Sequence, residues 1–409
     1  MPFKNPILST VLFIVLYLYI YNPIPRWPGF GFGIVLMLFA LVYVILNLRT
    51  ARQYLRCYKT ELILSLLMIP YVLAVCIANG EEDLQVISEL ITWVIMSTCV
   101  PIFLIRVLLV RCKGLIFWDA ILFVGFVASL ISCIALFVPG VNMFLREIQL
   151  EITGGQSEEQ MAFRFFGLAI NLSSAYGYMQ GLMASLCLLR LDKNHKRYAL
   201  YFLTMVISVI INARTGLFPV FITVLYLVVN AAIKFKVGQL IKLSIAAVFA
   251  FFSASFIINQ IPEVTDFVMD FVDQLSIMFL EDDNGLENSA YVTMLKFPET
   301  VMGFIFGEGR SLYGAGAWIS SDIGYVNQIF LGGIIFAGSL VIYEIILYRQ
   351  IIIMSKEKVF ATIFFLSLLA FNYKGVNFYA GGAYIKVWIL YYYVLVHNQI
   401  SNKNKIVIS

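Results

Sequence analysis

Four basic residues lie beside glycines or aromatic residues, where a ligand could come close to the backbone. They are Arg164 in Phe-Arg-Phe-Phe-Gly, Arg214 in Asn-Ala-Arg-Thr-Gly, Arg310 in Gly-Glu-Gly-Arg and Lys374 in Asn-Tyr-Lys-Gly. A guanidinium binds phosphate through paired, charge-assisted hydrogen bonds. Several such cations facing one cavity would therefore suit a diphosphate. The alternative is that each cation reaches the membrane interface or pairs with an acidic neighbour. Arg214 fits this alternative least, because short apolar runs flank it on both sides.

Two carboxylates could act beside these cations. Asp322 lies in Ser-Ser-Asp-Ile-Gly-Tyr, and Glu308 lies in the same glycine-rich run as Arg310. A carboxylate can take a proton from a sugar hydroxyl as a general base, and apolar surroundings raise its pKa for that task. The alternative for Asp322 is a helix N-cap, a position that Ser and Asp favour.

The composition places these residues in a membrane protein. Of 409 residues, 61% are hydrophobic and 13% are charged, with a mean hydropathy of +0.90. Soluble proteins are about 45–50% apolar and 25% charged, so the class of soluble enzymes is excluded. The net charge of +4 is too small to indicate nucleic acid as a partner. The six cysteines form no C-x-x-C pair and are expected to be buried, inert thiols.

The apolar runs predict an all-α, polytopic helical bundle of about twelve transmembrane helices in a single integral membrane domain, 1–409. A span needs about 20 predominantly apolar residues. The predicted spans are 6–22, 29–48, 61–79, 85–105, 117–138, 166–189, 198–211, 216–233, 243–260, 323–348, 359–372 and 383–397. The short runs around Arg214 and Lys374 predict broken or tilted spans, which are tolerated where the backbone lines a polar cavity.

The distribution of basic residues predicts the orientation of the spans. Loops on one side carry 20 of the 28 Lys and Arg residues, so this side is expected to be cytoplasmic, with both termini. The opposite side is acidic and carries a large loop, about 261–322, between the ninth and tenth spans. Within that loop, 264–275 has the spacing of an amphipathic helix on the membrane or on its own loop.

Other kinds of chemistry find little support. Both histidines, His195 and His397, lie on the cytoplasmic side, so imidazole catalysis or a His-ligated metal on the outer face is not expected. The acidic run 281–285 lacks the full EF-hand pattern. The sequence shows no P-loop and no soluble lobe, so an ATP-driven pump subunit is not expected. We expect no cofactor and no metal.

Four motifs in 160–335 resemble the bacterial O-antigen and capsule polymerases of the Wzy type, within the wider O-antigen polymerase and ligase group. The motifs are Arg164-Phe-Phe-Gly167 with Asn171, Ala213-Arg214-Thr215-Gly216, Phe304-Ile-Phe-Gly307-Glu-Gly309, and Asp322-x-Gly-Tyr325 with Gly332-Gly333. Their order and their side of the membrane match that family. The first 150 residues match only as hydrophobic spans.

The resemblance implies a glycosyltransferase of the bacterial cytoplasmic (inner) membrane whose active site faces the periplasm. It would move the growing glycan from undecaprenyl diphosphate to the non-reducing end of the next lipid-linked repeat unit. The resemblance implies that Arg164 and Arg214 of this chain stabilise the departing diphosphate. It also implies that Asp322 orients or deprotonates the acceptor hydroxyl. The substrate-binding residues would be Arg310, Lys374, Asn171, Tyr325 and Glu308. A chain-length regulator and a flippase are the further implied partners.

Two alternatives stay open. The ligase branch carries an outer histidine near the position of Asp322, which this chain lacks, so polymerase is favoured over ligase. A flippase for lipid-linked oligosaccharides also has about twelve spans. However, a transporter built from two halves should show matching halves, and here only the second half carries a long loop.

Overall fold

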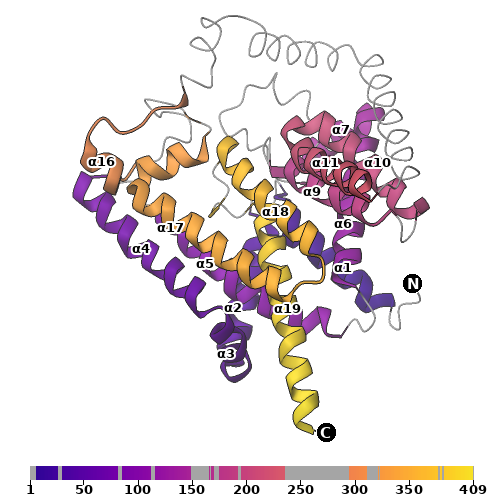
Figure 1. Cartoon of the computed structure of the whole chain (residues 1–409), viewed down its shortest axis with the longest axis horizontal. Coiled ribbons are helices and arrows are strands. Elements are labelled where there is room, and N and C mark those ends of the chain that lie inside the picture. Colours follow the sequence, from indigo (N-terminus) through magenta and orange to yellow (C-terminus); the bar gives the residue numbers. More distant parts are fainter. Residues whose placement is uncertain are drawn as a thin grey trace, which may run out of the picture.

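The computed structural model describes most of the chain as helices (Figure 1). The described residues are 6–25, 30–81, 85–111, 116–148, 165, 167–169, 175–191, 195–234, 294–310, 321, 323–375, 378–379 and 382–408; for 195, 214 and 402–408 only the backbone is described. Within these ranges the elements are helices, and no β-strand is assigned.

The first half contains α1 (Pro6–Tyr21), α2 (Phe32–Leu46), α3 (Leu48–Cys57), α4 (Lys59–Asn79), α5 (Gln85–Leu104) with the π-helical η1 (Ile105–Leu109), α6 (Phe117–Phe137) and α7 (Pro139–Ile148). The second half contains α9 (Ala175–Leu189), α10 (His195–Asn212), the 3-10 turn η2 (Arg214–Gly216), α11 (Leu217–Ile233), α16 (Val301–Phe306), α17 (Gly324–Met354), α18 (Lys358–Phe371), the 3-10 turn η3 (Asn372–Lys374) and α19 (Ala383–Ile408).

The helices fit a membrane protein. Among the described residues four are long and apolar enough to cross a bilayer alone: α4, α5 with η1, α6 and α17. A fifth span is formed if α2 and α3, bent by 105°, are counted together. Helices also occupy most of the other predicted ranges, while 243–260 lies outside the described residues. The helical membrane class is therefore supported, and the number twelve stays a prediction.

Three boundaries differ from the sequence prediction. The basic segment expected as a loop at 49–59 is helix α3 up to Cys57, which buries Ala51 and Tyr54 and exposes its arginines, as an amphipathic helix does. Of the predicted span 166–189, α9 covers Ala175–Leu189, while Gly167 has a φ of +63°, which an α-helix does not allow; 166 and 170–174 lie outside the described residues. The span predicted at 323–348 is broken within α17 at Gly332 and Gly333.

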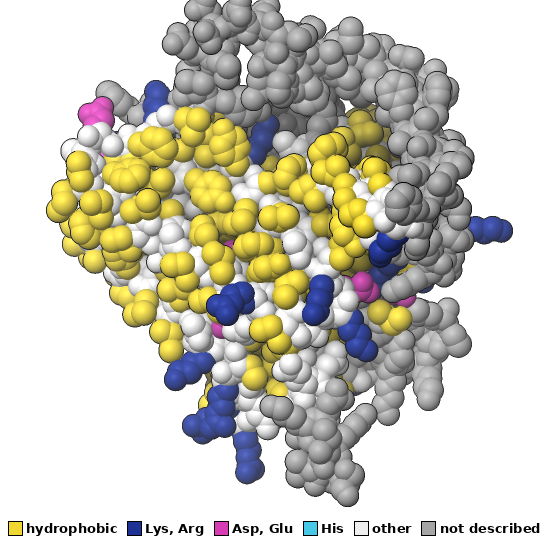
Figure 2. Space-filling model, in the orientation of Figure 1, with side chains coloured by type: hydrophobic (Ala, Val, Ile, Leu, Met, Phe, Trp, Pro, Cys, Tyr) yellow, Lys and Arg dark blue, Asp and Glu magenta, His cyan; other side chains and the backbone are white. Residues whose placement is uncertain are grey.

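The ends of the helices gather at two opposite ends of the bundle. At one end Tyr54 of α3 contacts His397 of α19, with 2.8 Å between Oη and Nδ1. Farther along the bundle, the buried Lys386 of α19 donates from Nζ to the Tyr19 carbonyl of α1 at 3.2 Å. On the face in Figure 2, hydrophobic side chains cover the middle and Lys and Arg side chains gather beside α3. We call the end of the bundle at α3 the α3 end, and the opposite end, where α16 lies in Figure 1, the α16 end. Which of the two ends faces the cytoplasm stays a prediction.

Aromatic side chains fill the interior around α19. Trp388 stacks on Phe364 of α18 with 4.6 Å between ring centroids, and Tyr178 of α9 stacks on Phe371 at 3.7 Å. Of the five described cysteines, all of them free thiols, four are buried as predicted and Cys57 is exposed. Its exposure follows from its place at the end of the amphipathic α3.

Much of the predicted outer loop 261–322 lies outside the described residues. The amphipathic segment 264–275 and the acidic run 281–285 belong to that part. Described are 294–310 and residue 321, which include the short α16. Thr300 caps this helix, since its Oγ1 accepts from the Gly303 amide at 2.9 Å.

Candidate functional site

The turn that carries Arg214 is pressed against α9. A Cβ added at Gly181 would lie 1.7 Å from the Gly216 carbonyl oxygen, and one added at Gly177 would lie 2.8 Å from the Ala213 carbonyl oxygen. These two glycines, four residues apart on one helical face, therefore let the backbone of 213–216 lie directly on the helix. The two short runs predicted at 198–211 and 216–233 are accordingly two helices, α10 and α11, joined by the 3-10 turn η2.

Asn212, at the end of α10, ties three segments together beside this turn. Its side chain is buried, and its Oδ1 accepts from the Phe165 amide at 2.9 Å. Its Nδ2 lies 3.0 Å from Ser132 Oγ of α6, 3.2 Å from the Phe165 carbonyl and 2.8 Å from the Ser208 carbonyl. The Ser132 hydroxyl also donates to the Phe165 carbonyl. We call Ser132, Phe165 and Asn212 the asparagine cluster.

The asparagine cluster brings two predicted site positions together in space. Arg164 precedes Phe165 directly, and Arg214 follows Asn212 by two residues. Both positions are thus within two residues of one hydrogen-bonded contact, although 50 residues separate them in the sequence. Arg164, Asn171 and the Arg214 side chain lie outside the described part of the structure.

A second arrangement joins the two glycine motifs. The break in α17 leaves carbonyls without helical partners, and the 307–309 segment supplies donors: the Glu308 amide binds the Phe330 carbonyl at 2.7 Å, and the Gly309 amide binds the Leu331 carbonyl at 3.2 Å. The approach is so close that a Cβ at Gly307 would lie 2.5 Å from the Gly332 Cα. The two motifs therefore form one unit, which the sequence did not predict.

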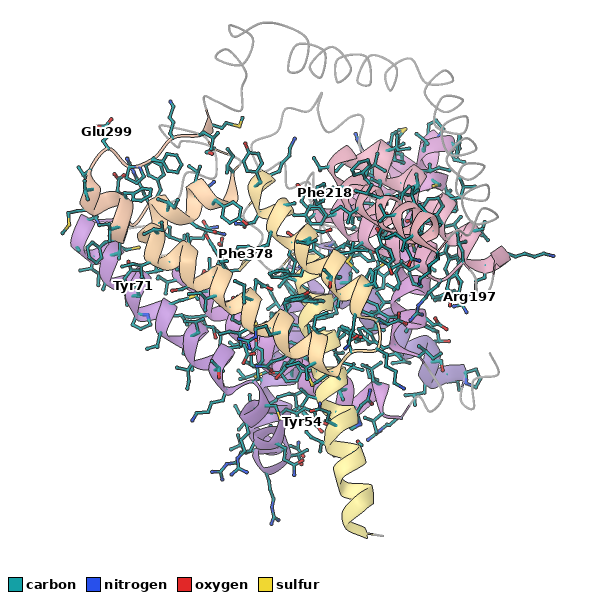
Figure 3. All side chains as sticks on the ribbon, viewed as in Figure 1. Tyr54, Tyr71, Arg197, Phe218, Glu299 and Phe378 are labelled. Atoms are coloured by element: carbon teal, nitrogen blue, oxygen red, sulfur yellow. The ribbon has the colours of Figure 1, made fainter. Side chains whose placement is uncertain are left out.

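Tyr71 of α4 (labelled in Figure 3) closes the back of this unit. Its hydroxyl lies 3.1 Å from the Phe306 carbonyl and 3.0 Å from the Gly332 carbonyl, so it can donate to either. The Cys76 thiol of the same helix donates to the Gly309 carbonyl at 3.2 Å. Two helices, α4 and α17, thus fix the backbone that presents Glu308 and Arg310.

Arg310 pairs with Glu308. The distance from Nη2 to Oε2 is 2.6 Å, and the guanidinium lies over the Phe330 ring at 5.5 Å from its centroid. The alternative that an outer cation pairs with an acidic neighbour is therefore observed for Arg310. Because 42% of its side chain is exposed, Arg310 is still accessible to an anionic ligand.

The start of α17 lies between these two arrangements and is held from both sides. Gln328 and Asn372 exchange side-chain hydrogen bonds at 3.0 and 3.1 Å, and both are buried. The Tyr325 hydroxyl donates to the Leu369 carbonyl of α18 at 2.9 Å. This places η3, which ends at the exposed Lys374, against the first turn of α17.

Asp322 lies outside the described residues, but both of its neighbours are described. Ser321 Oγ accepts from the Ile323 amide at 3.2 Å and donates to the Met294 carbonyl at 2.9 Å. The N-cap of α17 is Ile323, without a side-chain cap. Because Asp322 itself lies outside the described residues, both of its predicted roles, base and cap, stay predictions.

Contacts connect the two arrangements across the α16 end. From the turn of Arg214 they pass through Gly177 and Tyr178 of α9 to Phe371, and from Asn372 to Gln328 of α17. Figure 3 shows Phe218 and Glu299 toward this end and Tyr54 at the opposite one. The described site positions therefore share one end of the bundle.

The sequence analysis missed Asn212, Ser132 and Lys386 as structural parts of this region. Asn212 stood within the quoted motif but was not assigned a role. Lys386 was counted only as an outer cation, yet it is buried and its Nζ lies 5.8 Å from the centroid of the Tyr19 ring. A polar residue inside an apolar run was the available signal, because such a residue needs a partner.

In the described part of the chain no group of three or more His, Cys, Asp or Glu residues is placed to hold a metal ion. Comparison with known proteins adds no relative: no family model, no curated protein and no solved structure matches the chain.

Proposed function

We propose that the chain polymerises lipid-linked polysaccharide repeat units at the outer face of the bacterial cytoplasmic membrane. It transfers the growing glycan from undecaprenyl diphosphate to the next lipid-linked unit. The observation that supports this proposal is the asparagine cluster, in which Phe165 and Asn212, the near neighbours of Arg164 and Arg214 in the sequence, are joined by hydrogen bonds. Two guanidiniums on one ligand favour a diphosphate over a single carboxylate.

In the proposed reaction the acceptor hydroxyl oxygen bonds to the anomeric carbon of the donor. The bond from that carbon to the diphosphate oxygen breaks, and its electron pair leaves with undecaprenyl diphosphate. Arg164 and Arg214 stabilise the charge that develops on this leaving group. Asp322 takes the acceptor proton, and Tyr325, Lys374, Asn171, Glu308 and Arg310 bind the sugars and the second carrier. The diphosphate is already activated, so no nucleotide is consumed.

The proposed orientation puts the α16 end outside and both termini in the cytoplasm. The cations gathered beside α3 support it through the positive-inside rule. The lack of an outer histidine in the sequence disfavours a ligase, because the two histidines lie in the segments assigned to the cytoplasmic side.

The test is Arg214→Ala in cells that supply the repeat unit. Long-chain polymer should disappear from gels, while the single-repeat lipid intermediate accumulates at the outer face and the amount of protein is unchanged. Arg146→Ala, a cation of the amphipathic α7, is the matched control and should keep the normal chain length. Normal polymer in Arg214→Ala would end the proposal.

One observation favours a flippase as the second candidate. Glu344 of α17 is fully buried inside the bundle. Glu61 of α4 is also buried, and its Oε1 accepts from Gln350 at 2.6 Å. Carboxylates inside spans are typical of proton relays in transporters. A flippase requires that Glu344→Gln stop the repeat unit from reaching a membrane-impermeant oxidant outside, whereas a polymerase leaves its delivery intact.

A further inference from the structure

The amphipathic helix α3 lies across the end of α2. The two helices meet at Asn47 with a bend of 105°, and the Asn47 side chain caps the last turn of α2, since its Nδ2 donates to the Tyr43 carbonyl at 2.9 Å. When an apolar helix such as α2 stands across a bilayer, a helix bent by this angle lies nearly along the membrane surface. The ten residues of α3 extend about 15 Å in that direction, at 1.5 Å per residue.

The helix α3 presents its arginines on the side opposite to the one that it buries. Ala51 and Tyr54 (labelled in Figure 3) are buried, and the Tyr54 ring stacks on His397 of α19. Since an α-helix turns by about 100° per residue, the opposite face consists of three exposed residues, Arg49, Arg52 and Arg56. Within the described ranges these arginines form no ion pair, so their charge is open to an anion outside the protein.

A strip of apolar surface lies between the buried face and the basic face. Leu48 and Leu55, seven residues apart, form this strip, and 59% of Leu48 is exposed. Exposed apolar side chains continue beyond the bend on α2, at Phe39, Val42, Ile45 and Leu46. In a membrane protein such a surface is covered by lipid chains, which puts the arginines beside the strip at the level of the headgroups.

We propose that α3 binds anionic phospholipids, with its three arginines on the phosphates and its two leucines among the acyl chains. A guanidinium binds phosphate through paired, charge-assisted hydrogen bonds. Each cation beside an anionic lipid surface strengthens binding roughly fivefold. The other basic side chains gathered beside α3 (Figure 2) add to the same positive field.

The occupant is a lipid rather than an acidic protein. The basic face and the apolar strip adjoin each other, and a phospholipid carries both a phosphate and hydrocarbon chains. The strip is also continuous with the apolar side of α2, which a bilayer covers. This site goes beyond the proposed polymerase activity and does not depend on it.

The experiment uses the full-length protein in nanodiscs with photoreactive phosphatidylglycerol or phosphatidylcholine, each carrying a diazirine on an acyl chain. After irradiation, peptide mapping should find at least about fivefold more phosphatidylglycerol than phosphatidylcholine on 42–57. The triple variant Arg49→Gln, Arg52→Gln, Arg56→Gln should bring the two labels to within about twofold of each other, because it removes the charges and keeps the leucines. The three side chains are exposed, so the variant should fold, which thermal unfolding in detergent checks.

The matched control is the triple variant Arg349→Gln, Lys356→Gln, Lys358→Gln. It removes the same charge from exposed side chains of α17, of α18 and of the residues between them, and it should leave the preference on 42–57 unchanged. Leu48→Gln should instead lower the labelling of 42–57 by both lipids. Equal labelling by the two lipids in the parent protein would overturn the proposal and leave the arginines to an acidic protein. An equal loss of preference in both triple variants would also overturn it, because net charge alone would then account for the binding.

Discussion

Asn212 binds both backbone groups of Phe165: Oδ1 accepts from its amide at 2.9 Å, and Nδ2 donates to its carbonyl at 3.2 Å. A side-chain amide that binds both the backbone N–H and the backbone carbonyl of one residue holds that residue in place, in the same way as the backbone of a neighbouring β-strand does. The loop beginning after Arg164 is thereby attached to the end of α10. In a nonpolar environment such a contact is valuable, because no water replaces a lost partner.

Asn212→Ala should therefore impair polymer formation without removing either arginine. It leaves the part-buried Phe165 amide without its acceptor and the Phe165 carbonyl without one of its donors, which costs about 1–3 kcal/mol. As a positioning residue, Asn212 should affect kcat for repeat-unit transfer more than KM, measured on purified protein with lipid-linked substrate. Ser208→Ala, which removes a neighbouring hydroxyl that donates to Tyr176 Oη at 3.1 Å, is the control. Equal losses in the two variants would contradict a specific positioning role.

The helices could be predicted from the sequence because the thickness of the bilayer sets the number of apolar residues that a span needs, and a run of apolar residues is visible in a single sequence. The ranges 6–22, 61–79 and 117–138 agree with α1, α4 and α6 within two residues at each end. The α3 helix was missed because length was the criterion, and a ten-residue amphipathic helix fails it. Helical spacing of its buried residues was the signal that would have found it.

The sequence could predict which residues belong to the candidate site, but it could not predict which of them contact one another. The glycine pairs at 307–309 and 332–333 were each identified, yet nothing in their spacing shows that one docks on the other. Long-range pairing depends on the break within α17, where the φ of Gly333 is +66°. Glycine permits this conformation without requiring it, so the sequence alone left the break open.

Gly181→Ala should displace the Arg214 turn. The new Cβ would overlap the Gly216 carbonyl oxygen, and two backbone segments cannot separate without moving η2. We expect a loss of about 1–3 kcal/mol in stability and a loss of polymer. Gly338→Ala is the matched control, because α17 has open space there, and a better helix former should leave stability equal or higher by up to ~1 kcal/mol. Thermal unfolding in detergent and polymer gels measure both; a stable, active Gly181→Ala would refute the close packing.

Gly333→Ala should separate the Gly307–Gly309 segment from α17. The residue has φ +66° and ψ −174°, a region open essentially only to glycine, and its Cβ would lie 2.1 Å from the Ile305 carbonyl oxygen. Gly80→Ala shares a positive φ of +71° but meets no atom within 4 Å, so strain of about 1–2 kcal/mol is its only cost. Limited proteolysis within 294–310 should accelerate in Gly333→Ala and not in Gly80→Ala; the same rate in both would argue against docking.

Asp322→Asn tests the proposed base. A general base contributes about 10²–10⁴-fold, so the transfer rate should fall by at least about a hundredfold. Thermal stability should be unchanged, because Ile323 is the N-cap of α17. Glu308→Gln is the comparison: its partner Arg310 is partly exposed, and a smaller loss is expected. Nearly full-length polymer in Asp322→Asn would leave the acceptor proton to another group.

Arg190→Ala should destabilise the bundle at the end opposite the site. Arg190 is buried and donates to Asp119 at 2.9 Å and to Glu357 at 2.7 Å. Removing it leaves the buried Asp119 without its main cationic partner, which costs about 3–5 kcal/mol. Arg197→Ala removes a more exposed cation 3.8 Å from the same carboxylate and should cost at most about 1 kcal/mol.

The double variant Arg190→Ala with Asp119→Asn separates charge from packing. Because it removes the uncompensated carboxylate as well, it should be more stable than Arg190→Ala alone, as judged by thermal unfolding of the purified protein in detergent. If the double variant were no more stable than the single one, the loss would come from the packing of the Arg190 side chain between α6 and the start of α18. Polymer formed per folded molecule should be unaffected in either variant, because Arg190 follows the end of α9, about 20 Å along the helix from Gly177, on which the Arg214 turn packs.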